Sequence, residues 1–522
     1  MSDFSAGGIA VHTPVHAAGE QVAHAPYRWR WVALWVLLAA EAMDMLDALI
    51  ANVAAPSIRG DLGGGTATVQ WLGAAYALAM AVGLITGGRL GDIAGRKRMF
   101  LIGALGFTAA SLLCAVSWSP GMLIGARGLQ GLFGAVMIPQ GLGIIKEMFD
   151  GPETGRAFGM FGPVMALSTV GGPVLAGVLV DADLFGSGWR MIFAVNLPLG
   201  LLALLGGWKF LPESRSARRP RLDLVGAGLA SLAALLLVLP LVQGRELGWP
   251  AWTFLSMAAA IGLFAVFARY EVRLAEAGGD PLVVPGLFRK RAFTGGLVTG
   301  AVFFATVAGF SLMLSLFLQS GLGFAPLRAG LASLPWSLGM VLGFAVIQVA
   351  ERFGAVERFG RRVIQAGIVV MALGIATLAA TLNAAGTGVT AWHLAPALIV
   401  TGLGTGLVMG PFFDTVLGAV EPHESGSASG TITAVQQLGS ALGVAVLGTV
   451  FFGALGGLGT LGGQIAGAVG HVTPETDTAA RYNATMQVTL WAAIGLLAAA
   501  LAASFLLPRP GRAQERRTQG NG

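Results

Sequence analysis

The sequence predicts an all-α polytopic membrane protein. Hydrophobic residues make up 55% of the 522 residues and charged residues only 11%, a composition that excludes an ordinary soluble domain. Apolar runs recur along the chain, each of about 20 residues, which is the length that a helix needs to cross a bilayer. The 79 glycines lie among Leu, Val and Ala, and such small residues let membrane helices approach one another closely.

These runs predict fourteen spans. Lys and Arg are concentrated in alternate loops, and because basic residues gather on the cytoplasmic side, both termini are expected in the cytoplasm. The long Gly-rich loop 456–482 is then external, and the sequence assigns it no role. The expected spans are residues 31–55, 67–87, 99–117, 121–145, 157–180, 190–212, 222–243, 252–270, 293–319, 328–350, 363–382, 392–418, 428–456 and 483–507.

Two basic linkers, residues 209–221 and 269–291, divide the spans into six, two and six. The segments Asp92–Lys97 and Glu357–Arg362 share the pattern acid-x-x-Gly-Arg-basic, and each follows the second span of its half. Two related halves with a site between them are a recurrent plan of transporters. The predicted divisions are an N-terminal cytoplasmic tail, a six-helix bundle, a two-helix insert with its linkers, a second six-helix bundle and a C-terminal cytoplasmic tail: residues 1–30, 31–212, 213–285, 286–508 and 509–522.

Three acids stand inside the first apolar run. At about 100° per residue, Glu41, Asp44 and Asp47 lie on one side of a helix. A carboxylate at membrane depth is costly unless it faces protein, water or an opposite charge. We therefore expect this face to line a polar cavity, with Asp44 towards the centre of that cavity. The alternative is that Glu41 and Asp44 only satisfy neighbouring helices.

Span four contains Arg127, whose side chain stays charged and needs a partner inside a membrane. Asp47 is the first expected partner. An opposing Arg favours the ionised carboxylate while burial disfavours it, so a movable Arg makes proton affinity depend on conformation. We predict a proton-coupling site of Asp47, Arg127 and Asp44, in which Asp44 is shared with the substrate. A permanent structural salt bridge is the alternative.

The segment Gly88–Arg98 joins spans two and three and contains an acid among glycines. Glycines permit a tight turn, and Asp92 can accept from helix N-terminal amides or pair with a basic residue. Such a segment can clasp the two halves in one state and release them in another. Gly88, Asp92, Gly95 and Arg96 are therefore predicted gating residues, the alternative being a basic loop that only sets topology.

Two further features lie inside spans. In span five, Gly171 flattens one helix face and Pro173 removes a helix hydrogen bond, which together predict a bending and gating device. Asp414 in span twelve is another acid inside a span; it either binds a cation or a second proton, or faces the wet cytoplasmic mouth without a role. Glu41, Asp44 and Asp414 are the candidate substrate-binding residues.

These segments resemble signatures of the major facilitator superfamily, and specifically of its fourteen-span drug:proton antiporter family. The resemblance covers nearly all of residues 31–508. Glu41 and Asp44 are acids beyond the minimum family pattern, and Asp414 is not a fixed family feature, so these three bear on substrate range. The matching segments are Leu46–Pro56, Gly88–Arg98, Arg127–Gly134, Gly162–Gly177, Trp189–Pro198, Gln319–Gly330, Gly426–Gly430 and Gln436-Gln437.

The resemblance implies a major facilitator fold, with two six-helix bundles and two extra helices. It also implies a proton-coupled antiporter that exports lipophilic, cationic drugs or toxic metabolites by alternating access, since the Gly-rich span five is similar to the antiport signature. The alternative is an ion-coupled carrier for a specific metabolite or a self-made antibiotic. Sodium in place of protons, the substrate and the stoichiometry stay open.

The sequence lacks the motifs of several other classes of protein. The sequence offers no His/Glu metal cluster, Gly-x-Ser-x-Gly turn or Walker loop, so we expect no enzyme activity, no metal and no cofactor. The basic residues are split among short loops, which argues against nucleic acid as a partner. The expected partners are a small-molecule substrate, protons and the lipid bilayer, with the chain as a monomer. Arg greatly outnumbers Lys, which indicates a bacterial source and hence the inner (plasma) membrane.

Overall fold

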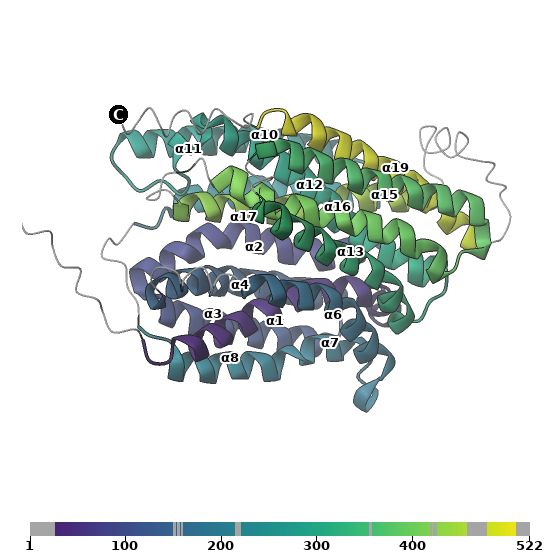
Figure 1. The fold of residues 1–522 in the computed structure, drawn as a ribbon, viewed down its shortest axis with the longest axis horizontal. Coiled ribbons are helices and arrows are strands. Elements are labelled where there is room, and N and C mark those ends of the chain that lie inside the picture. The colour runs from purple at the N-terminus through teal and green to yellow at the C-terminus, as the bar shows by residue number, and fades with distance from the viewer. Residues whose placement is uncertain are drawn as a thin grey trace, which may run out of the picture.

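The computed structural model describes residues 27–149, 153, 157, 160–213, 221–353, 358–417, 420, 425–456 and 478–507. The predicted C-terminal tail, most of the N-terminal tail and most of the loop 456–482 lie outside these residues. Within the described residues the chain forms helices and no strands, and the long helices run roughly side by side (Figure 1).

The first half of the chain folds into one group of helices, at the bottom of Figure 1. Local sequence sets several of its boundaries. For example, Ser119 caps the fourth helix by accepting from the Met122 amide at 3.3 Å, and Pro120 fills the first helical position. The helices are α1 (Arg30–Leu62), α2 (Thr66–Ala94), α3 (Arg96–Ala115), α4 (Pro120–Met148), α6 (Phe161–Asp181), α7 (Met191–Ala194) and α8 (Asn196–Phe210), with the short turns η1 (Leu184–Gly186) and η2 (Gly188–Arg190) before α7.

The rest of the chain forms a helix pair and a second group. The pair is α9 (Leu224–Gln243) and α10 (Ala251–Glu276), which pack together, and α9 also packs against α2 and α17. We call this pair the insert. The second group is α12 (Arg291–Leu316), η3 (Phe317–Gly321), α13 (Pro326–Arg352), α15 (Arg361–Ala385), η4 (Gly386–Gly388), α16 (Ala391–Leu417), α17 (Ser425–Leu455) and α19 (Thr478–Ser504), preceded by the short α11 (Pro285–Arg289).

Twelve helical segments of the described chain are long and apolar enough to cross a membrane. The fourteen spans predicted from the sequence include two more, α1 and α6. The 33-residue α1 carries Glu41, Asp44 and Asp47 within its length, and the shorter apolar part of α6 is Val170–Asp181. The structure thus supports a multi-pass membrane protein with twelve candidate spans by length and composition.

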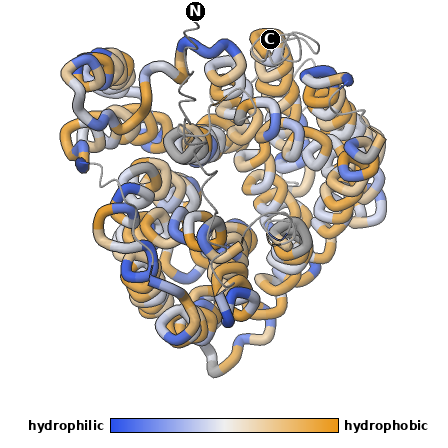
Figure 2. The backbone as a smooth tube through the Cα atoms, turned by 60° about the vertical axis from the view of Figure 1, so that its left-hand side comes forward, coloured by the Kyte–Doolittle hydropathy of each residue, from blue (hydrophilic) through white to orange (hydrophobic). Residues whose placement is uncertain are grey.

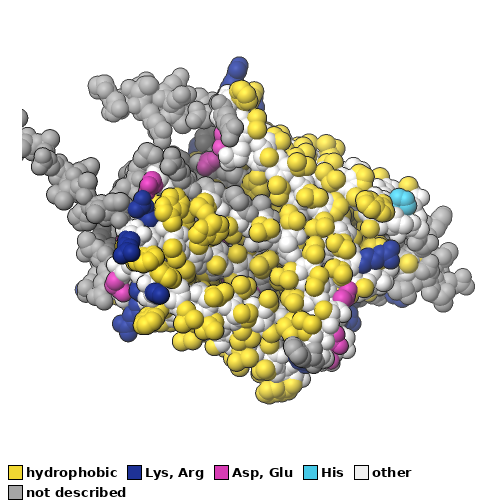
Figure 3. Space-filling view, turned by 60° about the horizontal axis from the view of Figure 1, so that its bottom comes forward, with side chains coloured by type: hydrophobic (Ala, Val, Ile, Leu, Met, Phe, Trp, Pro, Cys, Tyr) yellow, Lys and Arg dark blue, Asp and Glu magenta, His cyan; other side chains and the backbone are white. Residues whose placement is uncertain are grey.

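The surface agrees with a membrane location. Figure 3 shows one face on which hydrophobic side chains cover a broad middle zone, while Lys, Arg, Asp and Glu gather towards its two ends. Leu202 and Leu255 are 65% and 70% exposed, which would be unusual for a water-facing surface of this extent. In Figure 2, which looks more nearly along the helices, hydrophobic residues follow the helical tubes and many hydrophilic ones lie at their ends.

The two groups of helices contact each other mainly through three helix pairs: α2 with α17, α6 with α13, and α1 with α12. We call the end at which α1 begins and α19 ends the terminal face, on the left of Figure 1, and the other end the opposite face. Hydrogen bonds between the groups lie towards the opposite face. They are Ser315 Oγ to Asn52 O (3.0 Å), Gln319 Nε2 to Val53 O (2.6 Å), Gln70 Nε2 to Ala445 O (3.3 Å) and Leu327 N to Asp181 Oδ2 (3.0 Å).

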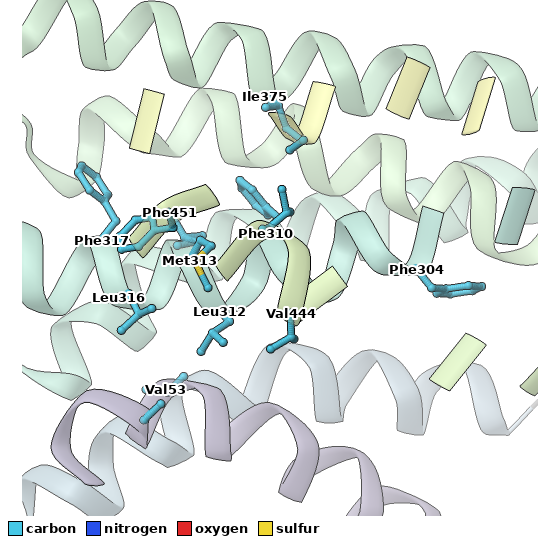
Figure 4. Packing of buried hydrophobic residues seen from close by; sticks show 14 of the residues in the cluster. Val53, Phe304, Phe310, Leu312, Met313, Leu316, Phe317, Ile375, Val444 and Phe451 are labelled. Atoms are coloured by element: carbon cyan, nitrogen blue, oxygen red, sulfur yellow. The ribbon is translucent and has the colours of Figure 1, made fainter. Parts of the chain in front are cut away.

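Apolar packing closes the same region. Figure 4 shows Val53 of α1 directed towards Leu312 and Leu316 of α12, within the largest buried cluster of the protein. Gly177 of α6 has no side chain to separate the helices, and a Cβ there would lie 2.3 Å from Leu327 Cα of α13. The two helix groups are therefore joined closely near the opposite face.

The structure corrects one expectation about the segment Gly88–Arg98. The sequence predicts a loop, but α2 continues to Ala94 and α3 begins at Arg96, so only Gly95 lies between the two helices. Gly95 has φ +103°, a conformation that glycine adopts without strain. Gly360, at the corresponding point of the second half, also has positive φ (+48°) and directly precedes α15.

Candidate functional site

A buried ion pair lies inside the first helix group. Arg127 of α4 donates through Nη1 to Asp47 Oδ2 of α1, and each side chain is 1% exposed. Arg127 Nε also donates to the main-chain oxygen of Leu72 in α2, at 3.2 Å. The pairing that the sequence predicts between span one and span four is thus present, and α2 supplies a third contact.

Three neutral side chains complete the surroundings of Asp47. Gln130 Nε2 and Asn196 Nδ2 donate to Asp47 Oδ1, at 2.8 and 2.7 Å. The Ser111 hydroxyl accepts from both amides, at 2.9 Å from Gln130 and 3.3 Å from Asn196. Gln130 Oε1 in turn accepts from Arg127 Nη1 at 2.8 Å. The carboxylate is therefore held by donors from α4 and α8, with Ser111 of α3 behind them.

A second acid adjoins this network. The Tyr76 hydroxyl of α2 donates to Asp44 Oδ1, and the Arg127 guanidinium lies 4.4 Å from the centre of the Tyr76 ring. The guanidinium is also 5.7 Å from the centre of the Phe193 ring, so aromatic faces cover the charge where hydrogen bonds do not. Asp44 is 7% exposed. Tyr76 thus connects the two acids through one aromatic side chain.

Glycines of α4 allow these groups to meet. A Cβ on Gly131 would lie 2.3 Å from the main-chain oxygen of Tyr76, and one on Gly134 would lie 3.1 Å from Asp44 Oδ1. With glycine at both positions, α4 approaches α1 and α2 closely enough for Arg127 to reach Asp47. The spacing of Arg127, Gly131 and Gly134 also puts all three on neighbouring turns of one helix face.

The buried ion pair is sensitive to the loss of either of its two charges. Removing one partner of a buried salt bridge typically costs about 3–5 kcal/mol, because it leaves an unpaired buried charge. Neutralising Asp47 with a proton has the same consequence for Arg127 unless the guanidinium finds other acceptors. The contacts of this ion pair therefore join α1, α2, α4 and α8 around one buried charge pair.

The acid face of α1 lies differently from the sequence expectation. Asp44 and Asp47 point into the first helix group, against α2, α4 and α8, and not onto an open cavity wall. Glu41 lines a small recess with residues of α1, α3 and α4, including Leu37, Phe100 and Gly141. Within the described chain, Glu41 makes no hydrogen bond or ion pair. Asp414 has an exposed side chain near the end of α16, in the other helix group, and no described contact joins it to the acids of α1.

The predicted gating residues form a separate group at the terminal face. Arg96 Nη2 bonds Asp92 Oδ1 at 2.9 Å, and Arg96 Nη1 bonds Glu147 Oε1 of α4 at 3.0 Å. Gly88 faces Pro139, at 3.7 Å from the position a Cβ would take, and Gly95 forms the turn itself. These contacts join α2, α3 and α4 of the same group.

Span five contributes to the contact between the groups. A Cβ on Gly330 of α13 would lie 2.2 Å from the Pro173 main-chain oxygen, so Pro173 lies at a close contact between α6 and α13. Gly172 packs against Leu49 of α1. Gly171 has no atom within 4 Å of the position a Cβ would take, and it is not part of this close contact.

Sequence reasoning missed four members of the site. Gln130 and Asn196 lie in segments that resemble family signatures, whereas Ser111 and Tyr76 lie in apolar runs outside those segments. A buried polar residue on an otherwise apolar helix was the available signal, but the sequence does not show which of these helices meet. Cys114 lies at the edge of this network, with Sγ 3.7 Å from Gln130 Oε1 and its thiol buried. In the described residues no group of three or more His, Cys, Asp and Glu is arranged to hold a metal ion.

Comparison with known proteins identifies the family. The model of the Major Facilitator Superfamily matches residues 37–444. The chain belongs to this superfamily. Solved structures of other transporters share the fold: a peptide transporter of the POT family described as auto inhibited has a TM-score of 0.65 at 15% identity, covering 92% of this chain and 98% of its own. A bacterial homolog of the human lysosomal transporter Spinster, described as inward-facing and unoccupied, has a TM-score of 0.62 with the same identity and coverage.

Relatives of this major facilitator protein include proteins that are named for antibiotic transport, export or resistance. The probable actinorhodin transporter of Streptomyces coelicolor is 51% identical over 83% of this chain and 75% of its own length. The tetracenomycin C resistance and export protein of Streptomyces glaucescens is 33% identical over 85% of this chain and 81% of its own. The multidrug resistance protein Stp of Mycobacterium tuberculosis is 35% identical over 78% and 73%. All three are similar along most of their length.

Proposed function

We propose that this protein is a proton-coupled antiporter that exports lipophilic, cationic drugs or toxic metabolites across the bacterial inner membrane by alternating access. The observation that carries the proposal is the buried Asp47–Arg127 ion pair with its network of donors. A carboxylate that a movable cation can meet or leave is a minimal device for linking proton binding to conformation. The names of these relatives, which refer to antibiotic transport, export or resistance, support drug-like cargo.

In this proposal the protein has fourteen spans, with α1 and α6 added to the twelve apolar helices. The first six form residues 31–212, the insert lies within 213–285, and the second six form 286–508. The tails 1–30 and 509–522 are cytoplasmic, so the terminal face is the inner face. The protein acts as a monomer, without metal or cofactor.

The cycle starts from the arrangement described above, with the helix groups joined near the opposite face. In this state substrate enters from the terminal face. Proton arrival at Asp47 from the other side neutralises its charge, weakens its bond to Arg127 and frees α4 to move relative to α1. Asp92 and Arg96 then bias the exchange between states, and Gly171 and Pro173 of α6 give the moving helix its bend.

Substrate contacts are assigned to Glu41, Asp44 and Asp414. Glu41 has no partner among the described side chains and lies beside apolar groups, a setting suited to a lipophilic cation. Asp44 shares Tyr76 with the network of Asp47 and Arg127, so a cation near Asp44 competes with a proton electrostatically. Asp414 faces outward on α16, where an entering cation meets it first.

The experiment is transport in inside-out membrane vesicles with a pH gradient of chosen sign. Fluorescent lipophilic cations should accumulate when the vesicle interior is acidic, and should leave when the gradient is reversed. Substitution of a sodium gradient should give no accumulation. Accumulation driven by sodium alone, or uptake that follows the proton in the same direction, would overturn antiport with protons.

A second candidate is an ion-coupled carrier for one specific metabolite or self-made antibiotic. The observation that favours it is the relative at 51% identity, which is named for a single compound, actinorhodin. A growth assay over a panel of toxic compounds separates the two candidates. Protection against one chemical class alone favours the specific carrier, and protection against several unrelated cations favours the multidrug exporter.

A further inference from the structure

Two buried carboxyl groups face each other where the insert meets α2. Asp223 directly precedes α9 and is 7% exposed, and Glu271 lies near the end of α10 and is 3% exposed. The position that a Cβ on Gly226 would take is 2.1 Å from Asp223 Oδ2 and 2.4 Å from Glu271 Oε1. Both oxygen atoms therefore point to one spot, which a glycine leaves open. We call Asp223 and Glu271 the carboxyl pair.

These two facing oxygen atoms have no hydrogen-bond partner among the described residues. The other oxygen atom of each group does. Asp223 Oδ1 accepts from the Gly226 amide at 2.8 Å and from the Tyr270 hydroxyl at 2.9 Å. Glu271 Oε2 accepts from the Val283 amide at 3.0 Å. Two buried acceptors that face each other without a donor repel, and one proton between them converts that repulsion into a hydrogen bond.

One cation lies close to the carboxyl pair, and it does not bond to either carboxyl group. Arg89 of α2 donates to the main-chain oxygen atoms of Arg221, at 3.1 Å, and Asp280, at 2.8 Å. It also donates to the main-chain oxygen of Pro281. The other acids that act on this guanidinium are the side chains of Asp280 and Asp92. A carboxyl pair with one proton carries one negative charge opposite Arg89, whereas a fully ionised pair carries two.

We propose that the carboxyl pair is a second proton-binding site, separate from Asp47, which holds one proton between Glu271 Oε1 and Asp223 Oδ2. Asp223 remains the carboxylate because two donors already stabilise its charge at the N-terminus of α9. Glu271 takes a proton from water and becomes the carboxylic acid, and its O–H donates to Asp223. The two unpartnered oxygen atoms are then satisfied by the same proton.

This proton stabilises the contact between the insert and α2. With one negative charge in the pair, Arg89 keeps its bonds to the linker around Asp280 and Pro281. Loss of the proton adds a second negative charge, which draws the guanidinium away from those main-chain oxygen atoms. Arg89 is three residues before Asp92 on the same helix. The site therefore connects the pH of the solution at the terminal face with the predicted gating residues around Asp92.

Infrared difference spectroscopy of the full-length protein in lipid nanodiscs tests the site. The wild type minus Glu271→Gln spectrum should contain a protonated-carboxyl band at neutral pH that disappears at high pH. Glu276→Gln removes an exposed acid of the same helix and should remove no such band. Identical spectra of wild type and Glu271→Gln in this region at every pH would show that Glu271 is ionised throughout, and would overturn the proposal.

Thermal unfolding gives a second readout that is independent of transport. At neutral pH the folded protein holds a proton that the unfolded chain has already released. The wild type should therefore lose stability as the pH rises and the folded protein loses that proton. Glu271→Gln replaces the acid with an amide that donates permanently to Asp223, and it should not lose stability over the same pH range. Glu271→Ala should be less stable than both at neutral pH. A parallel loss in wild type and Glu271→Gln would contradict a bound proton at this site.

Discussion

Asn196 of α8 donates its side-chain amide to Asp47 Oδ1 over 2.7 Å, while its own Oδ1 has no hydrogen-bond partner among the described residues. A half-turn of the amide would exchange the nitrogen and the oxygen and present an acceptor to a protonated Asp47. Asn196 can thus serve both protonation states of the carboxyl group, by donating to the charged form and accepting from the neutral one.

The first prediction concerns this residue. Asn196→Ala removes one of the donors that stabilise the Asp47 carboxylate, so protonation becomes easier. A hydrogen bond to a charged group contributes about 1.5–3 kcal/mol and one between neutral groups about 0.5–1.5 kcal/mol, so the charged form loses more and the pH profile of transport should move to higher pH by about one unit. Asn483→Ala removes a buried amide of α19 that bonds main-chain oxygen atoms, and it should leave the profile in place. An unshifted profile in Asn196→Ala would count against this role.

The second prediction concerns the ion pair. Asp47→Asn and Arg127→Ala should each abolish proton-driven export, since either change leaves no carboxylate–guanidinium pair for a proton to break. Transport in vesicles with an imposed pH gradient measures this. Asp61→Asn, which removes an exposed acid bonded to Arg190, is the control and should keep coupling. Full proton-coupled export by Asp47→Asn would refute the central claim.

The third prediction concerns charge at Asp44. Asp44→Asn should reduce transport of dications more than transport of monocations, because one negative charge fewer faces the substrate. Tyr76→Phe keeps that charge and removes only its hydrogen bond, so it should affect both classes equally. Transport rates of matched mono- and dicationic dyes provide the measurement. An equal loss for both dye classes in Asp44→Asn would remove the substrate role.

The fourth prediction concerns the bonded group at the terminal face. Asp92→Asn weakens the bond that Arg96 makes between the end of α2 and the start of α3. Turnover should slow several-fold while drug binding to the purified protein changes little, since no described contact joins Asp92 to the acids of α1. Arg98→Gln removes an exposed charge of the same segment and should leave turnover unchanged. Lost binding with intact turnover would argue against a gating role.

The fifth prediction concerns the closed end between the helix groups. Gly177→Ala puts a Cβ at 2.3 Å from Leu327 Cα, so α6 and α13 must separate. Distances between spin labels on the two groups should lengthen at the opposite face. Gly125→Ala of α4 is the control in the same helix group, because no atom lies within 4 Å of its added Cβ. Equal distances in Gly177→Ala and wild type would show that this contact does not hold the state closed.

The class of the protein and the identity of its central ion pair can both be predicted from the sequence alone. Hydropathy and length identify membrane helices because the bilayer requires about 20 apolar residues per span. Asp47 and Arg127 were predicted partners because each charge is too costly to bury alone. The repeated pattern around Gly95 and Gly360 can likewise be recognised in the sequence. Both glycines have positive φ and directly precede a helix that begins with basic residues.

The helices that pack against each face of α1 are seen only in the tertiary structure. Periodicity puts Glu41, Asp44 and Asp47 on one side, but it does not say whether that side faces a cavity or a neighbouring helix. The approach of α4, permitted at Gly131 and Gly134, brings Gln130 and Arg127 onto Asp47, while Tyr76 of α2 bonds Asp44. Only the fold could show the carboxyl pair, because Glu271 lies in α10, 48 residues after Asp223, which directly precedes α9. Contacts between residues distant in sequence depend on how the helices pack, and local sequence patterns do not specify that packing.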